Sequence, residues 1–351
     1  MLNRLFPLFI LISIISGCNS NDPDIRVVCL RNDIGNYIIK WETFPQIEGT
    51  LKLYVSDNPG HFSKNSPAVT TDIFEGRVTY VTNDNITRKY FCLSFNDKYE
   101  REVSSRAISM EKVQNLRDLG GYLTKEKKTT RWGKLYRSGE PTLLSEWDTL
   151  RLNNLGIKTI IDLRTKHEIE ISPIKYNKAT VLNYPINTAG MDTILTKIKE
   201  GKLRKGDGII FMQDLYIQFV EKNSEEFSKA LKALSNEENY PVLFNCTLGK
   251  DRSGFLAAIL LLTLDVPETT VMQDYMETKN YLDLSRFEDS VKDLEVDAQE
   301  TIALLLTANE TYLDVGLSKI RKDYGSIQKY LSEGLKITDK DRAKLKEILL
   351  Y

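Results

Sequence analysis

A cysteine and an arginine stand at the joint between two apolar stretches of the chain. Five residues separate Cys246 from Arg252, the apolar residues 242–244 precede them, and an apolar run follows up to residue 262. A loop of this length can wrap around one tetrahedral oxyanion if its amides point inward and Gly249 permits the tight curve. Arg252 would then bind two oxygens of the anion with its planar guanidinium. The spacing predicts an anion-binding loop with a thiol facing the anion.

The residues around this loop predict a buried strand before it and a buried helix after it. In an open α/β sheet, ligands bind at the carboxyl ends of the strands, and a helix N-terminus favours anions because its amides lack partners. The same positive field, together with Arg252, favours the ionised form of a neighbouring thiol. We therefore expect Cys246 to be a thiolate nucleophile at neutral pH.

The segment 246–254 (CTLGKDRSG) resembles the phosphate loop of protein tyrosine phosphatases, in the form CxxGKDR[ST]G of a bacterial subgroup of tyrosine and dual-specificity phosphatases. Further segments resemble that subgroup: 115–121 (NLRDLGG), 135–139 (LYRSG) and 162–165 (DLRT) followed by Glu168. The resemblance spans roughly residues 110–351. It implies a cysteine phosphatase fold and hydrolysis of phosphomonoesters, chiefly phosphotyrosine in proteins, with dual specificity or phosphoinositides as further substrate classes. It implies no cofactor and no metal.

The resemblance also implies a role for each reactive side chain of the loop. Cys246 attacks phosphorus to form a phosphocysteine, and Arg252 with the loop amides stabilises the equatorial oxygens in the transition state. Ser253 hydrogen-bonds the sulfur as it leaves during hydrolysis.

An acid must protonate the departing phenolate. In the subgroup the aspartate of the loop is implicated, so Asp251 is the first choice, and Asp214 and Asp207 are the alternatives. The structural alternative for Asp251 is an ion pair with Lys250 or a carboxylate that merely favours a helix start.

The other loop residues are expected on the substrate side. Thr247, Leu248 and Gly249 supply backbone to the anion, and Lys250 is either a second cation at the mouth that binds phosphate or a solvated lysine. Asn245 stands where the family usually has a histidine that hydrogen-bonds the loop. We expect its amide to supply a similar donor.

Three other chemistries fit less well. A nucleotide-binding phosphate loop needs a glycine where Phe244 stands and Ser or Thr where Asp251 follows the lysine. A metal hydrolase needs clustered histidines, and the chain has 2 histidines in all. A sulfurtransferase is disfavoured by the Arg-Ser closure of the loop. The serious alternative is a catalytically impaired lipoprotein that binds phosphate through the loop and binds a partner through the N-terminal region. The presence of Asn245 before the cysteine suggests this alternative.

From about residue 109, strand and helix signals alternate, which predicts a mostly parallel sheet covered by helices on both faces. A capping box at Ser145 opens a helix that ends at Gly156, and Thr338 caps the last helix. The other expected strands are 135–137, 157–163, 181–186 and 242–244, and the other expected helices are amphipathic ones around 212–219 and 227–234 and a buried one after Gly254.

Residues 25–108 predict a β-sandwich. Short apolar or alternating runs at 25–30, 37–42, 51–56, 78–82 and 89–95 are separated by turn residues. Trp41 and Tyr90 resemble the core tryptophan and the tyrosine corner of fibronectin type III or immunoglobulin-like modules. We expect a spacer or docking module without chemistry of its own, whose protein partner the sequence does not identify.

The first residues predict a lipoprotein signal peptide over 1–17 and a polar tether over 18–24. A weakly basic head precedes the apolar run 5–15, which is too short to span a bilayer, and Ser16-Gly17-Cys18 resembles a lipobox whose cysteine carries the acyl chains. We expect a membrane-anchored, exported bacterial lipoprotein. Cys29 and Cys92 are then a candidate disulfide in an oxidising compartment.

The overall charge is nearly balanced, with 48 Lys and Arg against 49 Asp and Glu. Nucleic acid is therefore excluded as a partner of the whole surface. The expected partners are a phosphorylated substrate and, through the lipid, a membrane. The chain is expected to divide into the sandwich, 25–108, and a tyrosine phosphatase-like catalytic domain, 109–351.

Overall fold

The computed structural model describes residues 22–32, 34–188, 190–204 and 206–351. The predicted signal peptide, most of the tether and Cys18 lie outside this part. Within it, no helix is both long enough and apolar enough to cross a membrane.

The N-terminal region is all β, as expected, and forms two antiparallel sheets. One sheet has the order β1-β2-β5 and the other β4-β3-β6-β7. Their bounds are β1 Asp24–Arg31, β2 Tyr37–Phe44, β3 Thr50–Ser56, β4 Val69–Asp72, β5 Arg77–Tyr80, β6 Tyr90–Phe95 and β7 Tyr99–Ser104. We refer to these strands as the sandwich. Strands β4 and β7 were not predicted, because both lie at sheet edges and consist mainly of polar residues, so that neither has an apolar run.

The predicted disulfide between Cys29 and Cys92 is wrong, because both cysteines are free. Successive side chains of a strand point to opposite faces. Cys29 packs with Phe91 and Leu93 between the sheets, whereas the Sγ of Cys92 lies 3.0 Å from Lys64 Nζ on the other face of its sheet. Burial raises the pKa of Cys29 to about 12 and that of Cys92 in the same direction.

The C-terminal region contains the predicted mostly parallel sheet, in the order β11-β10-β12-β9-β8. Its strands are β8 Arg117–Asp118, β9 Leu135–Ser138, β10 Thr159–Asp162, β11 Thr180–Asn183 and β12 Val242–Asn245. Four strands are parallel, and β8 runs antiparallel to β9 at one edge. The central position of β12 places the residues that follow it in the middle of the carboxyl edge of the sheet.

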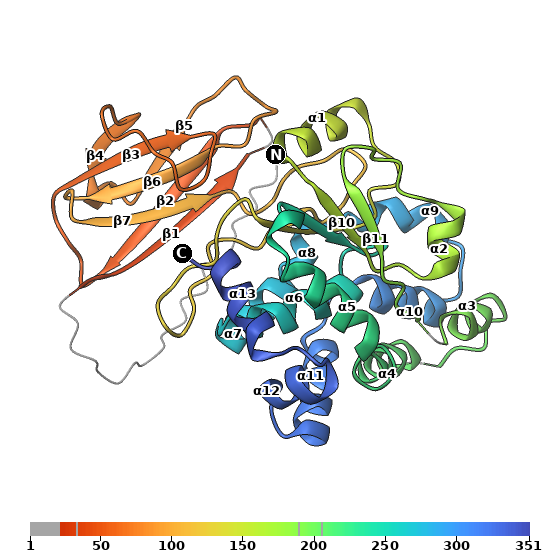
Figure 1. Ribbon diagram of the computed structural model, residues 1–351. Coiled ribbons are helices and arrows are strands. Elements are labelled where there is room, and N and C mark those ends of the chain that lie inside the picture. Colours follow the sequence, from red (N-terminus) through yellow and green to blue (C-terminus); the bar gives the residue numbers. More distant parts are fainter. Residues whose placement is uncertain (1–21, 33, 189, 205) are drawn as a thin grey trace.

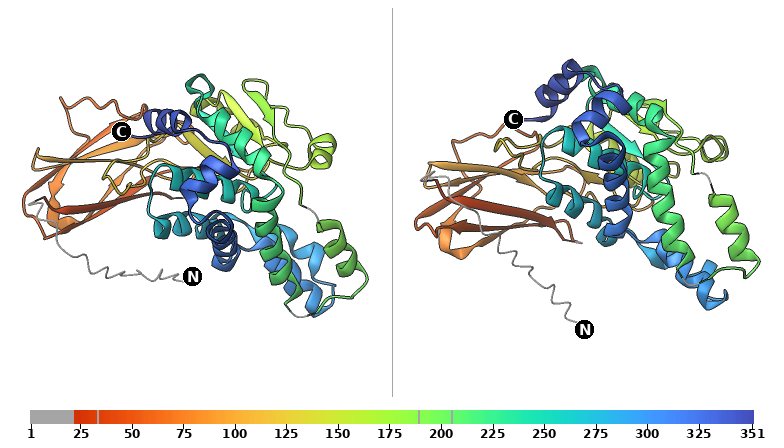
Figure 2. Two further views of the ribbon diagram at one scale, coloured as in Figure 1. Left: turned by 60° about the horizontal axis from the view of Figure 1, so that its bottom comes forward. Right: turned by 90° about the horizontal axis from the view of Figure 1, so that it is seen from below.

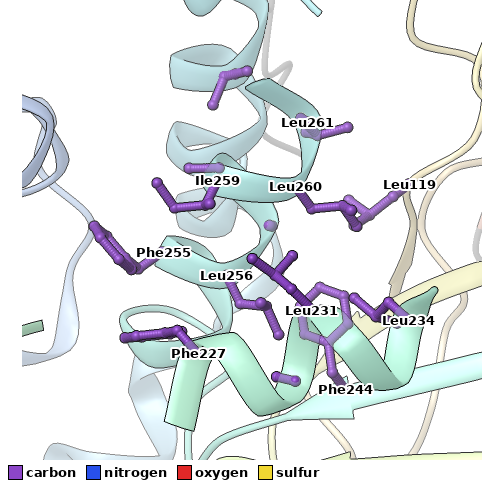
Figure 3. Packing of buried hydrophobic residues seen from close by; sticks show 14 of the residues in the cluster. Leu119, Phe227, Leu231, Leu234, Phe244, Phe255, Leu256, Ile259, Leu260 and Leu261 are labelled. Atoms are coloured by element: carbon purple, nitrogen blue, oxygen red, sulfur yellow. The ribbon is translucent and has the colours of Figure 1, made fainter. Parts of the chain in front are cut away.

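Helices cover both faces of this sheet (Figure 1). Leu243 faces the cluster built with α1, whereas Val242 and Phe244 face the larger cluster built with α4, α5 and α6. Figure 3 shows Phe255 and Leu256 of α6 packed close to Phe227 and Leu231 of α5. The helices of the sheet region as far as α6 are α1 Glu146–Leu155, α2 Lys166–Ile171, α3 Met191–Lys199, α4 Asp207–Glu221, α5 Ser224–Leu234 and α6 Arg252–Thr263.

The remaining helices follow α6 and wrap one side of the sheet region. The sequence analysis expected only the last of them, whose cap at Thr338 is confirmed. Figure 2 shows the sandwich at one end of the molecule and α3 at the opposite end. These helices are α7 Glu268–Met276, α8 Thr278–Tyr281, α9 Glu288–Val291, α10 Val296–Leu306, α11 Glu310–Tyr324, α12 Ile327–Lys329 and α13 Asp339–Leu349.

The sandwich and the sheet region share a buried junction. Trp132, from the sheet region, packs in the sandwich core. Arg88, from the sandwich, is 5% exposed and forms an ion pair with the fully buried Asp118 of β8, at 2.5 Å from Nη1 to Oδ2. The Asp118 carboxylate also accepts hydrogen bonds from the amides of Gly120 and Gly133. A charged pair therefore connects the two regions inside the protein.

Replacing Arg88 with Met is expected to lower the free energy of unfolding by about 3–5 kcal/mol, because Asp118 would remain buried without its counter-charge. Urea unfolding followed by circular dichroism measures the change. Lys52→Met is the matched control, since Lys52 pairs with an exposed Asp97 and its loss should change little. An Arg88→Met variant as stable as the control would contradict the shared junction.

Candidate active site

The predicted loop lies at the carboxyl end of the central strand β12 and runs directly into α6. Cys246 follows the last residue of β12, Asp251 is the N-cap of α6, and Arg252 is the first helical residue. The two neighbouring parallel strands, β10 and β9, end at the same edge. The loop is therefore set at the positive end of a helix of twelve residues, where unpaired amides favour an anion.

The carbonyls of this loop are held by donors on its outer side. A trans peptide places its N–H opposite its carbonyl, so carbonyls that are bound outside direct the following amides to the inner side. The bonds are Glu140 N to Thr247 O at 3.1 Å, Asn115 Nδ2 to Leu248 O at 3.2 Å and to Gly249 O at 2.8 Å, and Arg137 Nη2 to Gly249 O at 2.7 Å and to Lys250 O at 3.3 Å. The amides of residues 248–251 thus converge on one inner space, as the spacing predicts.

Arg252 is held in place by Glu168, the first residue of this site that the sequence did not assign. Nη1 of Arg252 lies 2.7 Å from Oε2 of Glu168, and Nη2 of Arg252 lies 3.2 Å from Oε1. Nη2 also donates to Thr247 Oγ1 at 2.9 Å, and that hydroxyl in turn donates to Glu168. Although burial raises the pKa of Glu168, Arg252 and Thr247 outweigh it and bring the pKa to about 2. Glu168 is therefore ionised at neutral pH and keeps the guanidinium oriented.

Cys246 lies at the bottom of the loop and is 2% exposed. Its Sγ is 3.4 Å from Oγ of Ser253, in the first turn of α6. The structure thus brings together the thiol, the hydroxyl and the arginine that the sequence predicts to act together. Residues 108–351 match the model of the tyrosine phosphatase family. The chain belongs to this family.

The chain is also similar to two curated relatives and to one solved structure. A protein of Cupriavidus necator named as a tyrosine-protein phosphatase is 29% identical over 242 residues, which are 66% of this chain and 84% of that protein. A tyrosine-protein phosphatase of Nostoc commune is 27% identical over 153 residues, 42% of this chain and 49% of the relative. The catalytic core of the PP-IP phosphatase Siw14 from S. cerevisiae is 17% identical over 52% of this chain and 83% of its own, with a TM-score of 0.28.

Asp251 of the phosphatase loop is partly exposed and faces a buried tyrosine. The hydroxyl of Tyr216 on α4 donates to its Oδ1 at 3.0 Å, and Nζ of Lys250 lies 3.4 Å from the same oxygen. The alternative acids lie elsewhere on α4: Asp214 is exposed on that helix, and Asp207 accepts the amide of Arg204 at its first turn. Of the three carboxylates, Asp251 alone belongs to the loop.

The expectation that Lys250 lies at the mouth of the site, as a phosphate ligand or a solvated cation, is wrong. Lys250 is fully buried, and its Nζ donates to the carbonyls of Leu305 and Thr307 near the end of α10. Burial lowers its pKa. The lysine connects the loop to α10 instead of contacting the solvent side.

Asn245 is also not a substrate ligand and does not bond the loop. Its side chain is fully buried, and Nδ2 donates to Oδ1 of Asp162 on β10 at 3.2 Å. Its Oδ1 is buried without a hydrogen-bond partner among the described residues. Asp162 in turn pairs with the buried Arg164 at 2.7 Å. The asparagine therefore steadies the neighbouring strand.

A buried ionic cluster supports the outer side of the loop. Asp274 of α7 pairs with Arg117 at 2.9 Å and with Arg137 at 2.7 Å, and Tyr122 donates to it at 2.6 Å. Arg117 donates to Oδ1 of Asn115, whose Nδ2 holds the loop. Asp274 was not predicted from the sequence. The available signal was Arg137 within the expected strand 135–137, because an arginine in a buried strand requires a buried partner.

Replacing Gly249 with Ala is expected to reduce turnover of p-nitrophenyl phosphate at least tenfold, because a Cβ would lie 2.4 Å from the backbone of Ser138 and φ is +67°. Gly325→Ala is the matched control, since its φ is +79° and a Cβ would meet nothing within 4 Å. Both variants carry similar backbone strain, of about 1 kcal/mol. Equal losses of activity in the two would show that the shape of the loop is not the reason.

Proposed function

We propose that this protein hydrolyses phosphomonoesters through a phosphocysteine, with phosphotyrosine in proteins as its main substrate and phosphoserine or phosphoinositides as further classes. The observation that carries the proposal is the outward bonding of four successive loop carbonyls, which leaves the amides of residues 248–251 facing the space beside Cys246. Together with the fixed guanidinium of Arg252, they suit a tetrahedral dianion.

The reaction takes two displacements at phosphorus. The thiolate of Cys246 attacks, the S–P bond forms, and the P–O bond to the leaving group breaks while Asp251 gives its proton to the leaving oxygen. Water then attacks the phosphocysteine and gives a proton to the Asp251 carboxylate, and the S–P bond breaks to release phosphate. Ser253 donates to the departing sulfur, and Arg252 and the amides stabilise the equatorial oxygens in both steps.

The alternative function is a protein that binds phosphate without hydrolysing it. It is favoured by Asn245, whose side-chain oxygen has no bonding partner among the described residues. It is opposed by the contact between Cys246 and Ser253 and by the position of Asp251 within the loop. A binding protein would need neither of these.

Replacing Cys246 with Ser is expected to abolish turnover of p-nitrophenyl phosphate and of a phosphotyrosine peptide by the protein lacking residues 1–18. Asp251→Asn should slow the peptide about 10²- to 10⁴-fold and p-nitrophenyl phosphate much less, because p-nitrophenolate leaves without a proton. Steady-state kinetics measures both. Asp214→Asn is the matched control and should resemble the parent protein.

Turnover that survives Cys246→Ser would overturn the cysteine mechanism. An equal effect of Asp251→Asn on both substrates would move the acid to Asp214 or Asp207. Tight binding of phosphotyrosine without any turnover by the parent protein would establish the alternative function.

We also propose that the sandwich is a fibronectin type III-like module. The support is the division of seven strands into the orders β1-β2-β5 and β4-β3-β6-β7, and a buried Trp41 whose Nε1 donates to Ile73 O at 2.7 Å. Tyr90 fits less well, since its hydroxyl accepts from the Arg88 side chain at 3.3 Å, whereas a tyrosine corner bonds backbone. A crystal structure whose sheets crossed near 90° would contradict an aligned sandwich.

Finally, we propose an exported lipoprotein anchored through Cys18, on the strength of the apolar run 5–15 and the small residues before that cysteine. Cells expressing the full chain should incorporate labelled palmitate into the protein, and Cys18→Ala should remove the label. Unchanged labelling in that variant would exclude the anchor at this position.

A further inference from the structure

A cleft lies between the loops of the sandwich and the sheet region. Its volume is about 440 Å³, within the range of small-molecule sites. The sandwich contributes Arg31 and Asn85 to its wall, and the sheet region contributes Arg151, Asn115 and Tyr281. The mechanism above uses none of this space, so the function of the cleft is open.

Two arginines of this wall donate to backbone carbonyls and form no ion pair within the described residues. The guanidinium of Arg31 donates to the carbonyls of Gly35 at 3.1 Å and Asp84 at 3.0 Å. That of Arg151 donates to the carbonyls of Ser109 and Asn85. Carbonyls fix the orientation of a guanidinium but leave its positive charge in place. Neither arginine forms an ion pair with any described residue, and Nε of Arg151 is buried without a hydrogen-bond partner there.

Acids near the cleft offset part of this charge. Asp283 pairs with the third arginine of the wall, Arg286, at 3.5 Å. Asp148 and Glu111 attract Arg151 without forming an ion pair with it, and the Asp148 carboxylate accepts the amides of Glu111 at 2.7 Å and Lys112 at 3.0 Å. Burial, and next the positive charge of Arg31, lower the pKa of Arg151. Two like charges on one wall, with one N–H unused, fit a bound anion of charge about two.

We propose that this cleft is a binding site for a dianion of metabolite size, a phosphate ester or a dicarboxylate, that Arg31 and Arg151 bind jointly. The sandwich and the sheet region each supply one of the two cations, so neither forms the site alone. The side-chain amides of Asn85 and Gln114 lie on the same wall and suit hydroxyl or carbonyl groups of the ligand body.

The cleft touches the support of the phosphate loop. Asn115 lines the cleft, and its side chain holds the carbonyls of Leu248 and Gly249. The amide of Asn115 donates to the carbonyl of Tyr281, another residue of the wall, at 3.1 Å. A ligand in the cleft would contact Asn115, which binds the carbonyl side of the loop, whereas the substrate phosphate meets the amide side. This part of the inference rests on the proposed function and implies an effector that changes kcat without competing with substrate.

Isothermal titration calorimetry tests the site with glucose 6-phosphate and with succinate, using the protein lacking residues 1–18 and carrying Cys246→Ser and Arg252→Met. Those two changes prevent turnover and weaken anion binding at the loop. Each of Arg31→Gln and Arg151→Gln is expected to weaken binding roughly 10- to 100-fold, as for loss of a charge-assisted hydrogen bond. Arg26→Gln is the matched control, since this arginine lies on the same strand as Arg31 with a side chain that is 62% exposed.

Tighter binding of glucose 6-phosphate than of succinate would identify a phosphate ester as the natural type of ligand, and the reverse would identify a dicarboxylate. Uncharged glucose should not bind if the site requires the charge of the ligand. Thermal unfolding checks that each variant folds; if Arg151→Gln does not, Arg31→Gln carries the test. Affinity that is unchanged by both substitutions, or no binding of either dianion at millimolar concentration, would overturn the site. In protein with intact Cys246, the ligand should alter kcat for p-nitrophenyl phosphate, and Arg151→Gln should remove the response. The calorimetric result stands whether or not the cysteine mechanism does.

Discussion

The orientation of four successive peptide groups is the constraint on which the catalytic site depends. An anion loop requires its amides to face one point, and amides that converge repel each other until an anion is present. The protein offsets this repulsion with hydrogen bonds to the carbonyls of the same peptide groups. Glu140, Asn115 and Arg137 bind the carbonyls of residues 247–250, so the amides have one direction left to them. The site is thus formed by its support before substrate arrives, which is the condition for electrostatic catalysis.

Two of the residues that hold the loop carbonyls are connected to a buried ionic cluster. The orientation of the loop therefore depends on charged pairs elsewhere in the fold. Arg117 and Arg137 are fully buried and share Asp274, and the charges of these arginines outweigh burial and hold the pKa of that carboxyl low, at about 2. A buried charge without its partner is costly, so each member of this cluster fixes the others. The next residue after Arg117 is Asp118, which pairs with Arg88 of the sandwich. A continuous set of contacts therefore runs from the sandwich through β8 to the loop.

The chemistry of the site was predictable from the sequence because its reactive residues are local. Cys246, Arg252 and Ser253 lie within eight residues, and the strand before them and the helix after them follow from apolar runs. Partners far along the chain were not predictable. Glu168 pairs with Arg252 across 84 positions, and the sequence showed it only as part of the segment that resembles the family. The capping box that it forms with Thr165 gives it a sufficient local role and conceals the second one.

The fold was predictable to a similar extent. The parallel sheet and the caps of α1 and α13 are encoded in local sequence patterns, whereas β4 and β7 are edge strands made mainly of polar residues, which give no strong apolar signal. For Lys250, the local sequence pattern gave a wrong prediction instead of no prediction. A lysine beside a helix start is normally solvated, yet here two carbonyls at the end of α10 replace its water. Only the packing of a helix more than fifty residues away determines that outcome.

The distinction between local and distant contacts also explains why an asparagine can precede Cys246. The resemblance to the family implies a histidine at this position that bonds the loop directly, and here the amide of Asn245 donates to Asp162 instead. The loop does not lose its shape, because its carbonyls are bound by Asn115, Arg137 and Glu140. Of these three residues, Glu140 is linked to residue 245 indirectly, through Asp162 and Arg164. What Asn245 determines is the position of Asp162, and through Arg164 the position of Glu140, whose amide holds the first loop carbonyl. The substitution therefore acts on the loop through the neighbouring strand, and the geometry of the amides is preserved while the direct donor is lost.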